Sequence, residues 1–427
     1  MRSIWLSCIA LLLASCVFGP VKELKYQIED SWDEGKPVTE STPLKQIYQK
    51  KGTQTVWEVS TKSSDANKSL DFIVRNEKVM VLSAQGRLLA INQADGNIIW
   101  DKQFDAVVTS GLGANNNHLL FTSQDGYVWC LDLDGELLWK SYAGMVDVQP
   151  LVLDGSVIVR RNDNQFIEMK LIDGRQGWTY QAPTPPLTVN DKGKMLFSDG
   201  VIYTGLPAAK LIALEAATGA LIWEAAISRS KGASDIDRVI DITSIPVIDN
   251  ELIFTASMNG DTACLDRRSA QNLWSRPLSS FVGVTDHLDE VLVVHESNSI
   301  YSLDKISGET NWRNADLVGR NLTKGIIVDD MFVVGDYEGI LHMINIGDGK
   351  LVGRTYLGKN SPVVNNMMIG KDDSIIVMNE DGSILKLVIS DIDIPLDESK
   401  VISEEGGDAE NSTTLKLFDK LKDAILD

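Results

Sequence analysis

The sequence predicts an all-β fold, an eight-bladed β-propeller of four-stranded antiparallel blades that is closed by its N-terminal strand. Three observations support this prediction. A tryptophan recurs at nearly constant spacing, each repeat has the same order of β-rich runs and turns, and the two ends of the series are complementary parts of one repeat. The intervals between the eight repeat positions are 38 to 51 residues. A period near 40 residues with β signals is typical of propeller blades.

The tryptophan motif is a small turn residue followed, four residues later, by Trp or its substitute. It occurs seven times, as Gly96 with Trp100, Gly135 with Trp139, Gly174 with Trp178, Gly219 with Trp223, Ala270 with Trp274, Gly308 with Trp312 and Gly349 with Gly353. Asp, Ser or Thr precedes each turn residue, and these residues favour tight turns. We expect the tryptophans to be structural, because a large ring on an outer strand can fill the wedge between diverging blades. Gly353 leaves that wedge to another side chain.

Each repeat has the same internal order. A β-rich run such as residues 79–82 comes first, and a turn that often contains glycine follows, as at Gly86. A second alternating run, such as residues 88–91, leads to the glycine turn and the tryptophan strand. These signals define three strands, and a fourth fits in the stretch after the tryptophan.

The two ends of the series predict how the ring closes. Trp57 lies on a last-strand sequence, residues 55–59, that has no hairpin before it. Residues 374–389 contain the inner strands of a repeat but no tryptophan strand after them. Joining the two ends completes an eighth blade and removes the free sheet edges that would otherwise promote aggregation.

The N-terminus predicts export and lipid attachment. Residues 1–15 have the form of a secretory signal peptide, with Arg2 before an apolar run that is too short to span a bilayer. The run ends in LASC, which resembles the bacterial lipobox, so Cys16 is the predicted lipidation site and the first residue of the mature chain. An ordinary signal peptide that contains a cysteine is the alternative. Val17 is not the Asp that retains such proteins in the inner membrane, which favours the outer membrane.

Composition excludes several classes of protein. With 44% hydrophobic residues the chain is not intrinsically disordered. The excess of 60 Asp and Glu over 40 Lys and Arg gives a net charge of −20, so nucleic acid is not an expected partner. Apart from Cys16, the cysteines that remain after processing are Cys130 and Cys264. Two independent buried thiols are favoured for them, and a disulfide bridge is the alternative.

The sequence contains no constellation that indicates catalysis. Its four histidines are dispersed and match no metal-ligand spacing. The segment from Gly111 to Gly113 lacks the third glycine and the helix of a nucleotide-binding turn. We therefore expect no catalytic residue, no metal and no cofactor.

The repeat resembles that of the pyrroloquinoline-quinone-type propellers. The segment ALEAATGALIW at residues 213–223 carries the resemblance, and residues 90–100 and 302–312 have the same skeleton. That family includes quinoprotein dehydrogenases, so a periplasmic quinone-dependent dehydrogenase is the enzymatic alternative. Those enzymes typically carry adjacent cysteines beside the cofactor, which this chain lacks. A sugar- or peptide-binding propeller is a third hypothesis.

The lipobox, the short tether and the lone propeller together resemble the propeller lipoproteins of the outer-membrane β-barrel assembly (BAM) machinery. The resemblance covers residues 16–390. It implies a non-catalytic scaffold that is lipid-anchored in the outer membrane and faces the periplasm. It also implies binding to the POTRA domains of BamA and to other BAM subunits, and a role in the folding and insertion of outer-membrane proteins.

The same resemblance implies that two loops between blades contact the partner. DIDRVIDIT, at residues 235–243, is similar to the acidic loop of that family, and PLTVN, at residues 186–190, is similar to its apolar-plus-Arg loop one blade earlier. Asn190 stands where the family usually has Arg, and Thr243 stands where a second Asp is expected. The partner-binding residues implied are Leu187, Val189, Asn190, Asp237, Arg238, Asp241 and Thr243.

Repeat spacing supports the same two loops. The longest gaps between a tryptophan and the next β-rich run are 29 residues after Trp223 and 23 residues after Trp178. Excess length in a fixed repeat must emerge as loop, and loops commonly carry function. We expect the two loops to lie side by side on one face, with Asp241 as a rim charge beside apolar Leu187 and Val189.

The predicted organisation is therefore a signal peptide at residues 1–15, a lipid-anchored tether at 16–51, the propeller at 52–390 and an extension at 391–427. The extension begins as an acidic linker. It continues with a short amphipathic helix in which Leu415, Phe418, Leu421 and Ile425 are spaced along one side.

Overall fold

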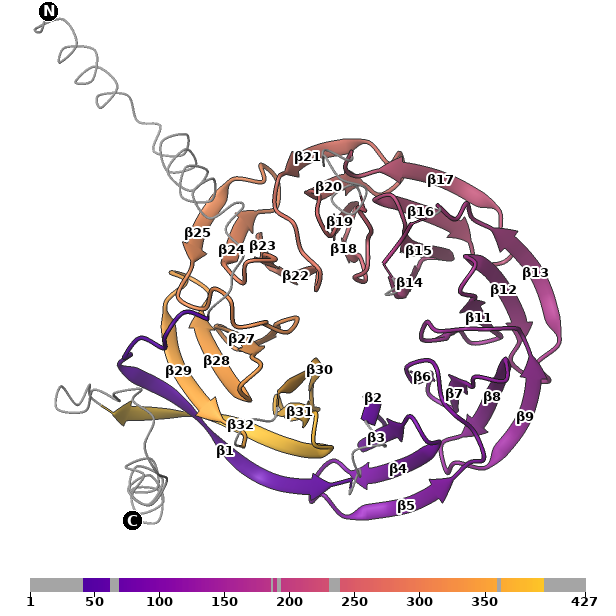
Figure 1. Ribbon diagram of the computed structural model, residues 1–427, viewed down its shortest axis with the longest axis horizontal. Helices are drawn as coiled ribbons and strands as arrows, with labels where there is room; N and C mark the ends of the chain where they lie inside the picture. Colours follow the sequence, from indigo (N-terminus) through magenta and orange to yellow (C-terminus); the bar gives the residue numbers. More distant parts are fainter. Residues whose placement is uncertain are drawn as a thin grey trace, which may run out of the picture. The chain divides into compact units, whose positions relative to one another are not determined.

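The computed structural model describes residues 41–61, 69–185, 187–189, 193–229, 239–358 and 362–394. Within these residues the strands form eight antiparallel blades around a central axis (Figure 1). The first strand of each blade lies nearest the axis and the fourth lies at the rim. No helical stretch of the described residues has the length and apolar character needed to cross a membrane.

Blades one to four follow the chain in order. Their strands are β2 (Ser69–Arg75), β3 (Lys78–Ser83), β4 (Arg87–Asn92) and β5 (Ile98–Gln103); β6 (Gly113–Ala114), β7 (His118–Thr122), β8 (Tyr127–Asp132) and β9 (Leu137–Tyr142); β10 (Leu151–Val152), β11 (Ser156–Arg160), β12 (Gln165–Lys170) and β13 (Gln176–Gln181); and β14 (Met195–Ser198), β15 (Val201–Leu206), β16 (Lys210–Glu215) and β17 (Leu221–Ala226).

Blades five to eight complete the ring. Their strands are β18 (Val247–Asp249), β19 (Leu252–Ala256), β20 (Thr262–Asp266) and β21 (Asn272–Arg276); β22 (Val284–His287), β23 (Glu290–Val294), β24 (Ile300–Asp304) and β25 (Thr310–Asn314); β26 (Ile326–Val328), β27 (Met331–Gly335), β28 (Ile340–Asn345) and β29 (Leu351–Tyr356); and β30 (Val363–Ile369), β31 (Ile375–Asn379), β32 (Ser383–Ile394) and β1 (Gln49–Ser60).

The N-terminal strand closes the ring, as predicted. β1 pairs antiparallel with β32, from Gln49 opposite Ile394 to Ser60 opposite Ser383, and so becomes the outer strand of blade eight. It also touches β29 through a parallel contact at Lys51, so that blades seven and eight form one continuous sheet. The predicted fold is confirmed, and the closing strand is longer than the predicted residues 55–59.

The position of a strand within its blade decides its burial. β3 and β4 are each buried at four central positions, because neighbouring blades cover both faces of the sheet. The outer strand β5 is exposed or half-exposed throughout. Strands covered on both faces are encoded by nearly continuous apolar runs, which explains why the inner runs were visible in the sequence.

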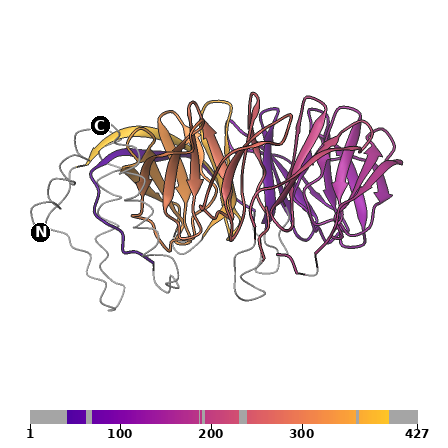
Figure 2. The same cartoon turned by 90° about the horizontal axis from the view of Figure 1, so that it is seen from above.

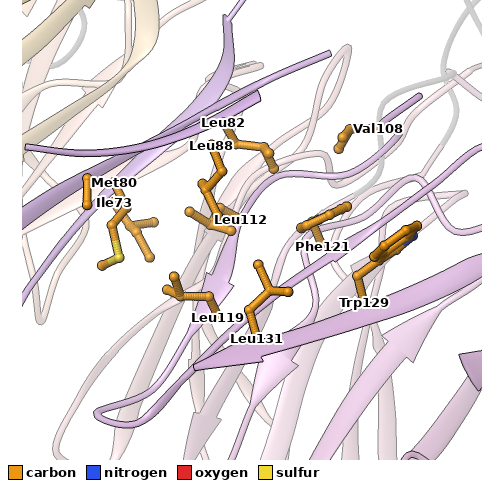
Figure 3. Packing of buried hydrophobic residues seen from close by; sticks show 11 residues of the cluster. Ile73, Met80, Leu82, Leu88, Val108, Leu112, Leu119, Phe121, Trp129 and Leu131 are labelled. Carbon is orange, nitrogen blue, oxygen red and sulfur yellow. The ribbon is translucent and has the colours of Figure 1, made fainter. Parts of the chain in front are cut away.

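The apolar core lies between adjacent blades (Figure 3). Met80 and Leu88 of blade one share a cluster with Leu119 and Phe121 of blade two, and all four side chains are fully buried. Phe121 stacks on Trp129 with ring centroids 5.7 Å apart. Burial of one such side chain contributes roughly 1.5–3 kcal/mol, so each blade depends on its neighbours for stability.

The repeated tryptophans join each blade to the next. The Trp57 ring packs on the turn at Gly96, where an added Cβ would lie 2.8 Å from the ring, and its Nε1–H donates to the carbonyl of Gln93 (3.0 Å). The same indole-to-carbonyl bond recurs in the later blades, from Trp100 to Leu133, Trp139 to Leu171, Trp178 to Ala216, Trp223 to Arg267, Trp274 to Lys305 and Trp312 to Ile346. In six repeats the turn glycine therefore receives the tryptophan of the preceding repeat.

Gly353 differs from the expectation for its position. The backbone of β1 fills part of the space beside it, since the Lys51 carbonyl lies against it, and the side chain of Met343 also lies close to it.

The folded body is slightly longer than the predicted residues 52–390. Its strands run from Gln49 to Ile394, and residues 41–48 already contact blades six and seven, as shown by the bond from the Thr42 N–H to the Val318 carbonyl (3.0 Å). The predicted signal peptide, Cys16 and the extension beyond residue 394 lie outside the described residues.

Candidate partner-binding loops

The connections between successive blades lie on one face of the ring, which we call the loop face (Figure 2). Each connection runs from the outer strand of one blade to the inner strand of the next. The turn between the second and third strands of each blade lies on this face too, and bridges such as Val108 with Ser123 join a connection to that turn. The remaining turns lie on the opposite face, which we call the hairpin face.

The two predicted loops lie side by side. The N–H of Val189, in the connection from blade three to blade four, donates to Oδ2 of Asp241 in the next connection (2.7 Å). Leu187 is 58% exposed and Val189 is half-buried. Asn190, Asp237 and Arg238 lie outside the described residues.

Asp241 is not the rim charge that the sequence suggested. Its side chain is 4% exposed, and its Oδ1 accepts the N–H of Ala208 (3.0 Å) while Oδ2 accepts that of Val189. Burial raises the pKa of this carboxyl group, although the two N–H donors and the charge of Arg160 oppose that effect. The carboxylate is directed inward and connects the two loops, because two amide donors of neighbouring segments need an acceptor there.

Thr243 is also directed inward. It is 7% exposed, and its Oγ1–H donates to the carbonyl of Phe281 (2.8 Å) in the connection from blade five to blade six. The Val189–Asp241 and Thr243–Phe281 bonds thus link three successive connections into one strip on the loop face.

A buried arginine fixes the base of the first loop. Arg160, at the end of β11, is fully buried, and its Nη1 donates to the carbonyls of Gly193 (3.1 Å) and Gly205 (2.8 Å). Its Nε and Nη2 donate to Oδ1 of Asn164 (3.2 and 2.8 Å). Burial lowers the pKa of the guanidinium to about 10, so the group remains charged near neutral pH. Gly193 is where the loop returns to blade four, and this end of the loop is held rigidly.

The loop face carries exposed apolar residues that the sequence reasoning missed. Phe281 is 38% exposed, Met145 is 57% exposed and Val107 is 48% exposed, each in a connection between blades. Extra loop length was the sequence signal for the two predicted loops. The connection after Trp274 is the shortest of the series, so this signal did not indicate Phe281. An apolar residue inside a connecting segment was the available signal.

The remaining candidate groups are structural. In the part of the chain that the structure describes, no three His, Cys, Asp or Glu side chains are arranged to hold a metal ion. Cys130 and Cys264 are free and fully buried, which confirms the independent thiols, and burial raises the pKa of each to about 12.

Comparison with solved structures shows the same architecture. The chain superposes on BamB from Moraxella catarrhalis with a TM-score of 0.71 and 21% identity, over 79% of this chain and 99% of that chain. A europium-containing methanol dehydrogenase gives a TM-score of 0.57 and 14% identity, over 76% and 84% of the two chains. At these identities the similarity shows the propeller fold alone.

Sequence comparison is more specific. Proteins named outer membrane protein assembly factor BamB are 29% identical over 346 residues in Burkholderia pseudomallei (80% of this chain, 90% of the relative) and 31% identical over 302 residues in Nitrosomonas eutropha (70% and 74%). The Escherichia coli K12 protein of that name is 27% identical over 364 residues (82% and 92%). The family model described as outer membrane protein assembly factor BamB matches residues 46–145 and 84–314. The chain therefore belongs to the BamB family of outer membrane protein assembly factors.

Proposed function

We propose that this chain is a non-catalytic scaffold lipoprotein of outer-membrane protein assembly. It binds the periplasmic POTRA domains of BamA within the BAM complex and so aids the folding and insertion of outer-membrane proteins. The observation that carries the proposal is the pair of inter-blade loops connected by Asp241, with Leu187 exposed on their surface. Membership of the BamB family supports it.

The chemistry of the loop face suits a protein partner of modest affinity. Leu187 lies on one side of the segment that contains Asp241 and Thr243, and Phe281 lies on its other side. The apolar centre of an interface carries most of its binding energy. Because Asp241 and Thr243 already hold the backbone at Val189 and Phe281, these positions lose little conformational entropy when a partner docks, and that loss otherwise weakens binding.

The membrane location rests on the lipobox. Acylation of Cys16 places the protein on the outer membrane, facing the periplasm, because several acyl chains on one residue anchor firmly. Mass spectrometry of the mature N-terminus tests this step. A Cys16→Ser variant should fractionate with soluble periplasmic proteins, and its retention in the membrane fraction would argue against the anchor.

The partner contact is tested by capture of purified BamA POTRA domains. Replacing Leu187 and Val189 together by Ala should weaken binding by about 2 kcal/mol, or about 30-fold in Kd, as expected for the centre of an interface. Folding should be unaffected, since the bond from Val189 to Asp241 uses the backbone N–H. Ile172→Ala is the matched control, because Ile172 is an 87% exposed aliphatic residue on the hairpin face of blade three. Normal binding by the double variant would place the contact elsewhere.

The non-catalytic assignment has its own test. The propeller fold is shared with a methanol dehydrogenase, so the alternative is a quinone-dependent enzyme. Absorbance and mass spectrometry of the purified protein should find no stoichiometric quinone. A bound quinone would overturn the assignment.

A further inference from the structure

We propose that residues 41–48 form a latch that carries the N-terminal segment from the hairpin face to the loop face and fixes its exit beside blade seven. The contacts of residues 41–48 with blades six and seven carry this inference. Its consequence for membrane orientation rests on the proposed lipid anchor at Cys16.

The latch crosses the rim of the ring. At its C-terminal end, Tyr48 lines a depression with Asp348 and Lys350, which lie in the β28–β29 turn on the hairpin face. At its N-terminal end, the hydroxyl of Tyr337 donates to Oγ of Ser41 (2.9 Å), and Tyr337 lies in the β27–β28 turn on the loop face. Figure 2 shows the indigo end of the chain descending from one face to the other at the left of the ring.

Two apolar side chains seat the latch between blades six and seven. Leu44 and Ile47 are half-buried and pack against the cluster that contains Trp312, Leu317 and Leu322. Half-burial of two such side chains is favourable by an amount comparable to a few net hydrogen bonds. This seat is independent of β1, which begins at Gln49.

Polar contacts hold the backbone of the latch. The N–H of Thr42 donates to the carbonyl of Val318 (3.0 Å), and the carbonyl of Thr42 accepts from Nη1 of Arg320 (3.4 Å). The carbonyl of Lys45 accepts from Nη1 of Arg354. These bonds pair backbone groups of Thr42 and Lys45 that an undocked segment would expose to water.

The buried side chains of Asp336 and His342 hold Arg320 and Arg354 in place. Nε of Arg320 donates to Oδ2 of Asp336 (2.7 Å), and the same oxygen is bonded to Nε2 of His342 (2.9 Å). Nε of Arg354 donates to Nδ1 of His342 (3.4 Å). Asp336 and His342 are fully buried, so both guanidinium groups are positioned before the latch docks.

The face on which residue 41 leaves the ring matters, because the depth of the ring is similar to the reach of a chain as long as residues 16–40. A strand of about six residues spans about 20 Å, which sets the depth of the ring. The 25 residues from Cys16 to residue 40 would have a root-mean-square reach of about 28 Å if they behaved as a random coil. An exit on the loop face therefore biases that face, with Leu187 on it, toward the anchored end.

Hydrogen exchange of the full chain tests the latch without the lipid. A Cys16→Ser background removes acylation, so failure of the anchor and failure of the latch are separate results. The Thr42 amide should exchange at least 100-fold more slowly than in an unstructured peptide. Exchange within tenfold of the unstructured rate would overturn the latch.

A latch variant and a matched control complete this experiment. Leu44→Ser with Ile47→Ser should raise exchange at Thr42 at least tenfold and leave β1 unchanged. Val56→Ser, which alters a 48% exposed residue of β1, should leave Thr42 unchanged. If the double variant speeds exchange in β1 as much as at Thr42, residues 41–48 are only part of the closing strand and the proposal is wrong.

Orientation is measured on the lipidated full chain in vesicles that carry an acceptor dye on the lipid headgroups. Donor dyes are attached through Glu296→Cys on the loop face or Lys350→Cys on the hairpin face, and both native residues are exposed. Cys130 and Cys264 are buried and do not compete for the label. Energy transfer should be greater from position 296 than from position 350, and the Leu44→Ser, Ile47→Ser variant should remove the difference. Equal transfer in the unaltered latch would overturn the orienting role.

Discussion

The carbonyl oxygen of Lys51 lies against the point where a Cβ would stand on Gly353. The two residues are partners in the parallel contact between β1 and β29. Gly353 occupies the tryptophan position of its repeat, and the other repeats carry an indole there. The seventh tryptophan strand lacks its ring because the closing strand passes through the space that the ring would need.

Gly353→Ala should therefore loosen the closure of the ring. The added methyl group cannot coexist with the Lys51 carbonyl, so β1 must shift, at a cost of about 1–3 kcal/mol for overpacking. Thermal melting should show a lower Tm, and hydrogen exchange in β1 should accelerate before that in other blades. Gly155→Ala is the control, since an added Cβ there meets no atom within 4 Å. Equal melting of the two variants would mean that the contact is not tight in solution.

Removal of residues 55–59 should destabilise the whole ring. The deletion takes away Trp57, whose ring seals blade eight to blade one, and it exposes the edge of β32. Loss of a buried large aromatic side chain alone costs about 3–5 kcal/mol. Urea unfolding should show either a large loss of stability or aggregation through the free edge. A deletion variant with unchanged melting would contradict the closure by β1.

The fold could be predicted from the sequence because its signals are local and repeated. A turn residue four positions before a tryptophan recurs in six repeats, and inner strands that are buried on both faces give apolar runs. The contact that each tryptophan makes could not be predicted in this way. Trp178 packs on Gly219, a separation of 41 residues, and no local pattern states that pairing.

The site was predicted only in part for a similar reason. A connecting segment between two blades correctly suggested the exposure of Leu187. An acidic residue in a long loop suggests a surface charge, yet Asp241 is drawn inward by the amides of Val189 and Ala208, which lie 52 and 33 residues away in sequence. Unsatisfied backbone donors of distant segments are invisible in the residue pattern that surrounds Asp241.

Asp241→Asn should destabilise the loops that Leu187 depends on. An amide offers one acceptor oxygen, so its NH₂ group would face one of the two N–H donors, and a buried unsatisfied group costs about 1–3 kcal/mol. Urea unfolding should show that loss, and POTRA binding should weaken because the loop is less ordered. Glu251→Gln, at an exposed ion pair with Arg268, should change neither quantity. A variant that loses binding at full stability would restore a direct role for the Asp241 carboxylate.

Acidification should destabilise the ring through His342 before most carboxylates are protonated. Burial lowers the pKa of this histidine, the charges of Arg354 and Arg320 lower it further, and Asp336 only partly opposes them. The neutral ring, with its proton on Nε2, satisfies both Asp336 and Arg354. The unfolded chain binds a proton near the ordinary pKa of about 6.5 while the folded chain does not, so the free energy of unfolding should fall by up to about 1.4 kcal/mol per pH unit below that value. Urea unfolding at pH 7.5, 6.5 and 5.5 measures the slope. His342→Gln should flatten it, and a slope that survives in the His342 variant would assign the effect to other groups.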